Sequence, residues 1–227
     1  MLVTSERLEL ELDRGSILRS LGYSDEVEPS PAISSLLDGY MENAHQLIEP
    51  CRSYVIRNVD SVSGSLAFVE DSIVFRSQVV ARLLERCCMV AAFVVTIGGH
   101  LENTVATLAE DGLILQSYVL DAIGTEAVER VAEYVQEQTR KMAAADGFVI
   151  GRRFSPGYCD WDLTQQEMIF GAVNAASIGV VLTEEYLMIP RKTISGIIGI
   201  GPAEGGLEHY NPCTSCDKRD CLGRRLS

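Results

Sequence analysis

One long segment without helix-breaking residues constrains the fold more than any other feature of this 227-residue chain. Between Ser117 and Ala145 there is no proline, and Gly124 is the only glycine. Apolar side chains recur on one face of the predicted helix and charged side chains on the other, as in a helix packed on a core. The apolar face has Val128, Val131, Val135 and Met142, and the charged face has Glu126, Glu133, Glu137 and Arg140. At 1.5 Å per residue this helix is roughly 40 Å long.

Strand patterns surround this helix without alternating regularly with helices. The continuous apolar run Met89–Ile97 predicts a strand buried on both faces. Leu66–Val69 and Ser72–Phe75 predict a hairpin, and Leu8–Leu12 predicts an edge strand because apolar and acidic residues alternate there. Further strands are predicted at Ser53–Val59, Gly179–Leu182 and Thr193–Ile200, and shorter helices at Ser16–Gly22, Pro31–Glu49, Ser77–Arg86 and Thr164–Val173. This mixture predicts an α+β fold with a mostly antiparallel sheet.

The composition changes near the carboxyl end of the chain. Up to Gly205-Gly206 the apolar residues follow regular spacings, and after it the chain is polar, basic and rich in cysteine. We therefore expect a single domain over residues 1–206 and a separate tail over residues 207–227.

The charge balance excludes several classes of partner. Lys and Arg number 19 against 32 Asp and Glu, a net charge of −13. A nucleic-acid binder needs a basic face, and an anionic membrane surface attracts basic segments, so neither partner is expected. The longest apolar run is about half of what a bilayer-crossing helix needs. Because no secretory signal is evident at the amino terminus, we expect a cytoplasmic protein with reduced cysteines.

Motifs of the common nucleotide-binding and hydrolytic sites are absent from the sequence. There is no dinucleotide fingerprint, no phosphate-binding Gly-Lys-Ser/Thr loop, no Gly-x-Ser-x-Gly elbow and no His-x-x-x-His pair. The segment Gly151–Trp161 is more informative, because it places arginine, tyrosine, aspartate and the only tryptophan on one Pro-Gly loop. Such a set can bind a zwitterionic ligand that has an aromatic base. An ordinary polar loop with a structural Arg–Asp pair is the alternative.

The order and spacing of several segments resemble the reactivation domain of cobalamin-dependent methionine synthase. Arg153-x-x-Pro156-Gly157-Tyr158 is similar to that family's Arg-x-x-x-Gly-Tyr stretch, and Glu126–Tyr134 is similar to the helix before it. Ile178–Glu184 and Pro190–Gly196 resemble the later Leu-Thr-Glu and Ser-Gly segments. The likeness covers about Thr96 to Gly201, and Leu18–Tyr23 resembles the amino-terminal part of small, free-standing members.

The resemblance implies a C-shaped α+β domain that binds S-adenosylmethionine (AdoMet) in a shallow site. It implies that Arg153 holds the AdoMet carboxylate, that Gly157 and Tyr158 line the site, and that Glu129 lies near it. In the family, the domain docks on the cobalamin domain when the cofactor has oxidised to inactive cob(II)alamin, and an electron from a flavoprotein plus the AdoMet methyl group restores methylcobalamin. This chain lacks the cobalamin, homocysteine and folate modules, so it would serve a methionine synthase that lacks its own reactivation domain.

The tail contains a cysteine pattern typical of metal sites. Cys213, Cys216 and Cys221 form C-x2-C-x4-C, and the first pair has the spacing at which one turn presents two sulfurs to one ion. Three ligands leave a fourth position, which His209 or Cys159 could fill around zinc. The same cysteines could instead bind an iron–sulfur cluster. Three reduced thiols without a metal are the remaining alternative.

Three functions follow from these patterns. The first is an accessory component that uses AdoMet for reductive remethylation of cobalamin on a partner. The second is a non-catalytic module that binds a corrinoid protein or delivers electrons, with an iron–sulfur or zinc site in its tail. The third is an unrelated acidic α+β domain with a structural zinc site. The residues alone leave open whether the chain is an enzyme component.

Overall fold

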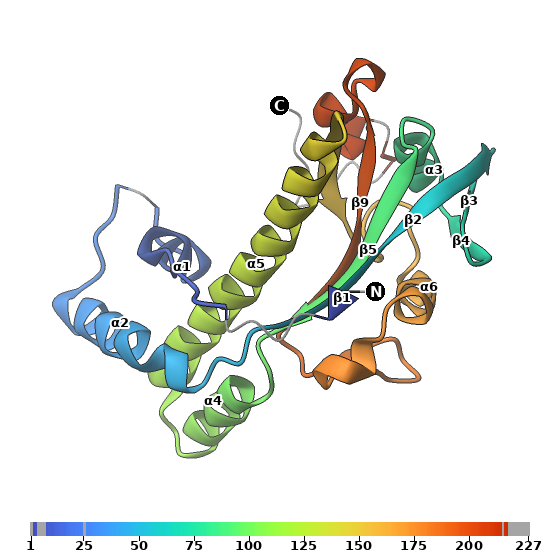
Figure 1. The fold of residues 1–227 in the computed structure, drawn as a ribbon. Coiled ribbons are helices and arrows are strands. Elements are labelled where there is room, and N and C mark those ends of the chain that lie inside the picture. Colours follow the sequence, from blue (N-terminus) through green and yellow to red (C-terminus); the bar gives the residue numbers. More distant parts are fainter. Residues whose placement is uncertain (1, 4–7, 25, 215, 218–227) are drawn as a thin grey trace.

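A seven-stranded antiparallel sheet forms the centre of the molecule (Figure 1). The computed structural model describes residues 2–3, 8–24, 26–214 and 216–217. The strand order is β4-β3-β2-β5-β9-β6, with β1 beside β2. The strands are β1 (Leu2–Val3), β2 (Cys51–Ser63), β3 (Leu66–Val69), β4 (Ile73–Arg76), β5 (Met89–Thr96), β6 (Phe148–Phe154) and β9 (Thr193–Pro202). A separate two-stranded sheet consists of β7 (Val181–Leu182) and β8 (Met188–Ile189). The α+β class predicted from the sequence is confirmed.

Strand β5 lies in the middle of this sheet because its side chains are apolar on both faces. It pairs antiparallel with β2 on one side and with β9 on the other. Every residue from Val90 to Thr96 is buried. The buried strand predicted at this position is therefore confirmed.

Helices cover both faces of the sheet. The long helix α5 (Ile114–Ala145) packs on one face, as its apolar stripe predicts. Helix α3 (Gln78–Leu84) packs on the other face, together with α6 (Gln166–Ala172). The remaining α-helices are α1 (Arg14–Ser20), α2 (Pro31–Asn43) and α4 (His100–Glu110). Single 3-10 turns are η1 (Ala44–Gln46), η2 (Leu163–Gln165), η3 (Ala175–Ile178), η4 (Ala203–Gly205), η5 (Leu207–His209) and η6 (Pro212–Thr214).

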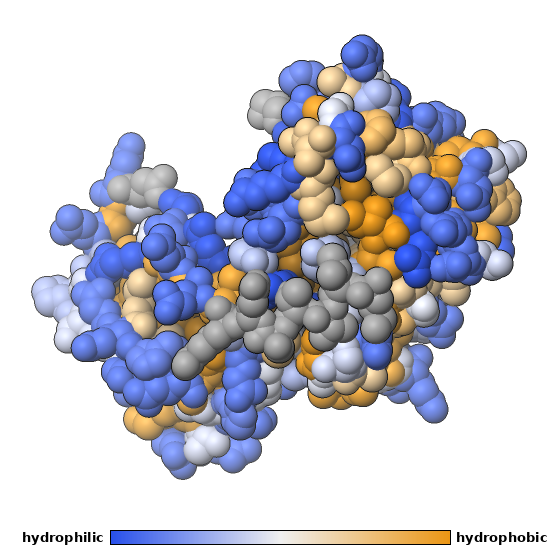
Figure 2. Space-filling model, in the orientation of Figure 1, coloured by the Kyte–Doolittle hydropathy of each residue, from blue (hydrophilic) through white to orange (hydrophobic). Residues whose placement is uncertain are grey.

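Helix α5 joins two ends of an open, C-shaped molecule. Helices α1 and α2 pack on the amino-terminal half of α5 through a small core of their own. The opposite half of α5 lies along the sheet (Figure 1). The space-filling view shows a hollow between the helical end and the sheet end (Figure 2). No helix in the described residues is long and apolar enough to cross a membrane.

Two local predictions from the sequence are wrong. Leu8–Leu12 forms no strand, and its leucines pack instead beside the core under α5. The edge of β2 at Ser53 and Tyr54 is occupied by β1, so this segment has no strand to pair with there. The polar loop predicted from Gly151 onward begins later, because β6 continues to Phe154.

The first residues after Gly206 are attached to the core. Leu207 is fully buried, and its side chain packs where Gly151 and Gly199 leave room. The hydroxyl of Tyr210 donates a hydrogen bond of 2.9 Å to the carbonyl of Val79. A boundary at residue 206 therefore stays a prediction, and a chain ending there would lose these contacts.

We expect Leu207→Ala to destabilise the protein by about 3 kcal/mol, because it leaves a cavity in a packed core. Urea unfolding, followed by circular dichroism, measures this change at an unchanged m-value. Leu187→Ala is the matched control, since Leu187 is 60% exposed. A chain truncated after Gly206 should unfold cooperatively at lower urea, and a non-cooperative melt would show that the tail belongs to the domain.

Candidate functional site

Arg153 connects the edge of the sheet to the long helix. It lies on β6, the last strand of the sheet, after a shift in the pairing of β6 with β9. Its Nη2 donates to the Glu129 carboxylate at 3.1 Å, and its Nε donates to the Gln136 amide oxygen at 2.9 Å. Glu129 and Gln136 are two turns apart on one face of α5. The structure thus brings together two of the predicted site residues, Arg153 and Glu129.

Gln136 is a site residue that sequence reasoning missed. Gln136 follows Glu129 by seven residues, and this spacing could have indicated it, because two residues seven apart lie on one face of a helix. Together the two hold the guanidinium in a fixed orientation. The Arg153 side chain is 21% exposed and that of Glu129 is 48% exposed, so solvent and a ligand can reach the pair.

Gly157 and Tyr158 lie on a tight turn that follows β6. Gly157 has a φ of +92°, which favours glycine, and its N–H donates to the carbonyl of Trp161 at 2.7 Å. The N–H of Trp161 in turn donates to the carbonyl of Tyr158 at 3.0 Å. The Tyr158 side chain is 61% exposed. The turn therefore presents this aromatic ring to solvent.

Trp161 anchors the turn and does not face a ligand. Its indole is 1% exposed, stacks on Phe154 at 5.7 Å between ring centroids, and meets Phe75 edge-on at 5.5 Å. Its Nε1 is buried without a partner among the described residues. The expectation that the tryptophan belongs to a ligand-binding set is wrong, because the apolar face of the sheet buries it.

Asp160 also has a structural role, because it binds the start of α3. Its carboxylate accepts hydrogen bonds from the Ser77 hydroxyl at 2.7 Å and from the N–H groups of Gln78 and Val79 at 2.6 and 3.3 Å. These groups are at the start of α3, where a negative charge is favourable. Burial raises the pKa of Asp160, but the hydrogen bonds outweigh it and hold the pKa below its ordinary value. The alternative of an Arg–Asp pair is wrong, since Arg153 pairs with Glu129.

We expect Asp160→Asn to destabilise the protein by about 1 kcal/mol at neutral pH, because an amide nitrogen would replace one accepting oxygen. A lowered folded-state pKa stabilises the protein above the unfolded-state value, and this stabilisation is lost as the pH falls through the folded-state pKa. The difference between wild type and variant should therefore shrink in acid. Urea unfolding at several pH values measures it, with the exposed Asp60→Asn as control; a difference independent of pH would contradict the assignment.

Three cysteines lie near this turn. Cys159 follows Tyr158, and the thiols of Cys216 and Cys213 lie close enough to affect its pKa. Burial, followed by these neighbouring thiols, raises the pKa of Cys159 to about 12. Two of the predicted metal ligands, Cys213 and Cys216, thus lie near Cys159, but the described residues contain no group of three His, Cys, Asp or Glu side chains arranged to hold a metal ion. The third, Cys221, lies outside the described residues.

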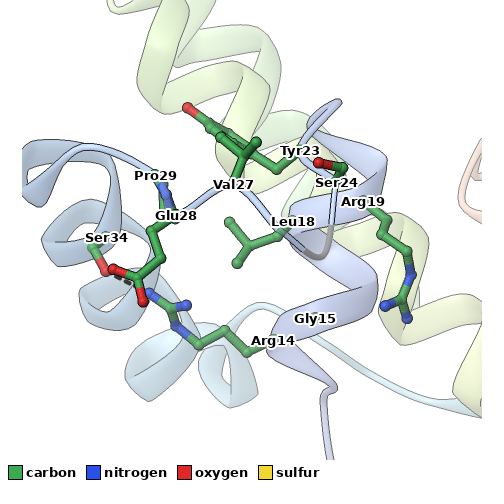
Figure 3. A pocket seen from close by; sticks show the side chains of 10 residues that line it. All are labelled: Arg14, Gly15, Leu18, Arg19, Tyr23, Ser24, Val27, Glu28, Pro29 and Ser34. Atoms are coloured by element: carbon green, nitrogen blue, oxygen red, sulfur yellow. Dashed lines mark hydrogen bonds between the residues drawn. The ribbon is translucent and has the colours of Figure 1, made fainter.

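The described residues also line two hollows away from Arg153. One, of about 300 Å³, lies between α1 and α2, where Arg14 donates to Ser34 (Figure 3). Arg14 also donates to Asp38. The other, of about 510 Å³, is lined by Arg82, Arg86 and residues of the tail such as His209 and Tyr210. Neither of these two hollows is lined by a predicted AdoMet-site residue.

Comparisons with known proteins concern the family and the fold of the chain. The family model described as vitamin B12 dependent methionine synthase, activation domain, matches residues 80–205, which is more than half of the chain. No curated protein matches the chain significantly. Among solved structures, the crystal structure of the MetH reactivation domain bound to AdoHcy is similar, with a TM-score of 0.64 and 16% sequence identity. That match covers 85% of this chain and 74% of the solved chain, and it shows the fold alone. The family match includes Glu129, Arg153, Gly157 and Tyr158 and ends before the cysteine-rich tail.

Proposed function

Because the chain belongs to the family of the vitamin B12-dependent methionine synthase activation domain, we propose that it binds AdoMet and supports reductive remethylation of a partner's cobalamin. The partner is a corrinoid-binding methyltransferase, namely a methionine synthase that lacks its own reactivation domain. A separate electron-donor protein supplies the electron. The solved relative was crystallised with AdoHcy, which is what remains of AdoMet after its methyl group has left.

The single observation that supports this proposal best is the exposed pair of Arg153 and Glu129. AdoMet ends in an α-amino acid, which has a carboxylate and an ammonium group on neighbouring atoms. A guanidinium binds a carboxylate through two parallel hydrogen bonds, and a carboxylate binds an ammonium group. Arg153 and Glu129 are 3.1 Å apart and both are reached by solvent. Side by side, they match the two charges of the ligand.

The turn after β6 suits the other end of the ligand. The exposed ring of Tyr158 can lie against a sulfonium cation or a base. The positive φ of Gly157 favours glycine, so the turn has no side chain at this position. Trp161 and Asp160 hold this turn on the sheet and on α3, so the ring is presented from a fixed support.

The chemistry requires positioning more than acid–base groups. An electron from the donor reduces the partner's cobalt, which then forms a bond to the AdoMet methyl carbon while the sulfur–carbon bond breaks and sulfur keeps the electron pair. No proton is transferred, so no general base is required. What this chain must do is hold AdoMet by its amino-acid end and leave the methyl group facing outward. An open site at the edge of the sheet meets that requirement.

Calorimetric titration tests the proposal. AdoMet and AdoHcy should each bind with one molecule per chain, and 5′-methylthioadenosine should bind much more weakly because it lacks the groups that Arg153 and Glu129 recognise. Equal binding of all three compounds would show that Arg153 and Glu129 do not recognise the amino-acid end of AdoMet. No binding of AdoMet would overturn the proposal and favour the non-catalytic module.

A further inference from the structure

A polar hollow lies between α3 and the segment that follows β9. Its volume of about 510 Å³ is within the range of small-molecule sites in proteins. One wall consists of Arg82, Glu85 and Arg86, from α3 and the turn after it. The other wall consists of residues after η4, namely Gly206, His209, Tyr210, Asn211 and Thr214. None of these residues belongs to the AdoMet site proposed above.

The charge of this hollow is opposite to that of the whole chain. The chain has 32 acidic residues against 19 Lys and Arg, whereas the hollow is lined by two arginines, a histidine and a single acid, Glu85. A concave site with an excess of basic side chains attracts anions. The end of a helix favours basic side chains, which accounts for Arg82 in the last turn of α3. It does not account for Arg86 and His209, which lie outside that helix.

The two guanidinium groups of the hollow have no anionic partner. The Arg82 side chain forms no ion pair and no hydrogen bond with the part of the chain that the structure describes. The Arg86 guanidinium lies over the Tyr210 ring at 5.5 Å, but it too pairs with no carboxylate among the described residues. By contrast, Arg130 and Arg153 each donate to a glutamate of α5. The N–H groups of Arg82 and Arg86 are therefore available to an external anion.

The core holds both walls of the hollow in place. Helix α3 packs on the sheet, and its Leu84 is fully buried. On the other wall Leu207 is fully buried, and the Tyr210 hydroxyl donates to the carbonyl of Val79 at 2.9 Å. The contact between Arg86 and Tyr210 joins the two walls. A ligand thus meets a site that is already formed.

We propose that this hollow binds a phosphate group between Arg82, Arg86 and His209, as free phosphate or as part of a small phosphate ester. A guanidinium donates two parallel N–H groups to phosphate oxygens, and clusters of arginine recognise phosphate in many proteins. The His209 imidazole has an N–H to donate in either protonation state. Because the basic side chains are confined to one hollow, they suit a single phosphate group and not the backbone of a nucleic acid.

Phosphate binding at this hollow is independent of AdoMet binding. AdoMet has no phosphate group, and Arg153 and Glu129 lie on other elements, β6 and α5. Either proposal can therefore fail without the other.

Calorimetric titration of the full chain with inorganic phosphate, pyrophosphate and ribose 5-phosphate tests the proposal at constant ionic strength. Ribose 5-phosphate contains no base and no amino acid, so it does not report on the AdoMet site. Citrate is the comparison anion without phosphate. Arg82→Ala is the main variant, because the Arg82 side chain has no bonded partner to lose. Arg86→Lys keeps a cation beside Tyr210 but loses the planar fork.

Arg76→Ala is the matched control, since Arg76 is an exposed arginine of β4 that does not line the hollow. Circular dichroism and urea unfolding show which variants fold. We expect the wild type and Arg76→Ala to bind one phosphate probe per chain, and Arg82→Ala to bind it about tenfold to 100-fold more weakly. Arg86→Lys should also weaken binding, and Arg82→Ala should bind AdoMet like the wild type.

Tighter binding of ribose 5-phosphate than of inorganic phosphate identifies an ester as the ligand, and equal affinities identify free phosphate. Three results would overturn the proposal. The first is that the wild type binds none of the phosphate probes. The second is that citrate binds as tightly as they do. The third is an unchanged phosphate affinity in folded Arg82→Ala, which would leave Arg82 only its role at the end of α3.

Discussion

Replacing Arg153 by alanine is expected to weaken AdoMet binding by about 30-fold to 4,000-fold. Truncating one partner of a hydrogen-bonded charge pair costs about 2–5 kcal/mol, and each 1.4 kcal/mol corresponds to about tenfold in affinity. In addition, the Glu129 carboxylate would lose the guanidinium that holds it in place. Calorimetry with AdoMet measures the change, and urea unfolding should show little effect on stability because the pair is partly solvated.

Two further variants sharpen this prediction. Arg153→Lys keeps the charge but loses the planar fork, so it should restore only part of the affinity. Arg140→Ala removes another arginine, which lies on α5, pairs with Glu137 and is half exposed, and this variant should bind AdoMet like the wild type. Wild-type affinity in Arg153→Ala would show that the ligand is bound elsewhere.

Replacing Trp161 by alanine is expected to destabilise the protein by about 4 kcal/mol, since a large buried side chain would leave a cavity. The loss includes its stacking on Phe154 and its edge contact with Phe75. Thermal and urea unfolding measure the effect. AdoMet affinity should fall as well, because the turn with Gly157 and Tyr158 is tied to the Trp161 backbone.

Trp161→Phe is the matched variant for this test. It retains an aromatic ring between Phe75 and Phe154 and removes the indole N–H that is buried without a partner. It should therefore cost much less than Trp161→Ala and leave AdoMet binding close to that of the wild type. Equal destabilisation by both substitutions would contradict the packing described for Trp161.

The elements predicted well from the sequence are those with strong local patterns. The apolar run from Met89, the helix through Ser117–Ala145 and the hairpin of β3 and β4 each follow one periodicity. Strand β6 was missed because two arginines and a glycine interrupt its apolar residues. It is a strand because β9 offers it an edge, and no local pattern records that partner.

The residues of the candidate site also divide into those that the sequence predicted and those that depend on the fold. Arg153, Gly157, Tyr158 and Glu129 came from the family resemblance, and the structure brings Arg153 and Glu129 into contact. Composition alone placed Trp161 beside the ligand, although the fold buries it. The sequence offered Cys159 and His209 as candidates beside the tail cysteines, and the position of Cys159 near Cys213 and Cys216 depends on how the tail packs against α3.

The transfer of a labelled methyl group from AdoMet tests the central claim most directly. The chain is mixed with a methionine synthase that lacks its own reactivation domain, holds oxidised cobalamin and is supplied with an electron donor; methyl-labelled AdoMet is then added. We expect that labelled methylcobalamin forms on the partner, that it requires this chain, and that Arg153→Ala strongly reduces its formation at limiting AdoMet while Arg140→Ala does not. Unlabelled cobalamin in the complete mixture, or label that appears equally without this chain, would contradict the account.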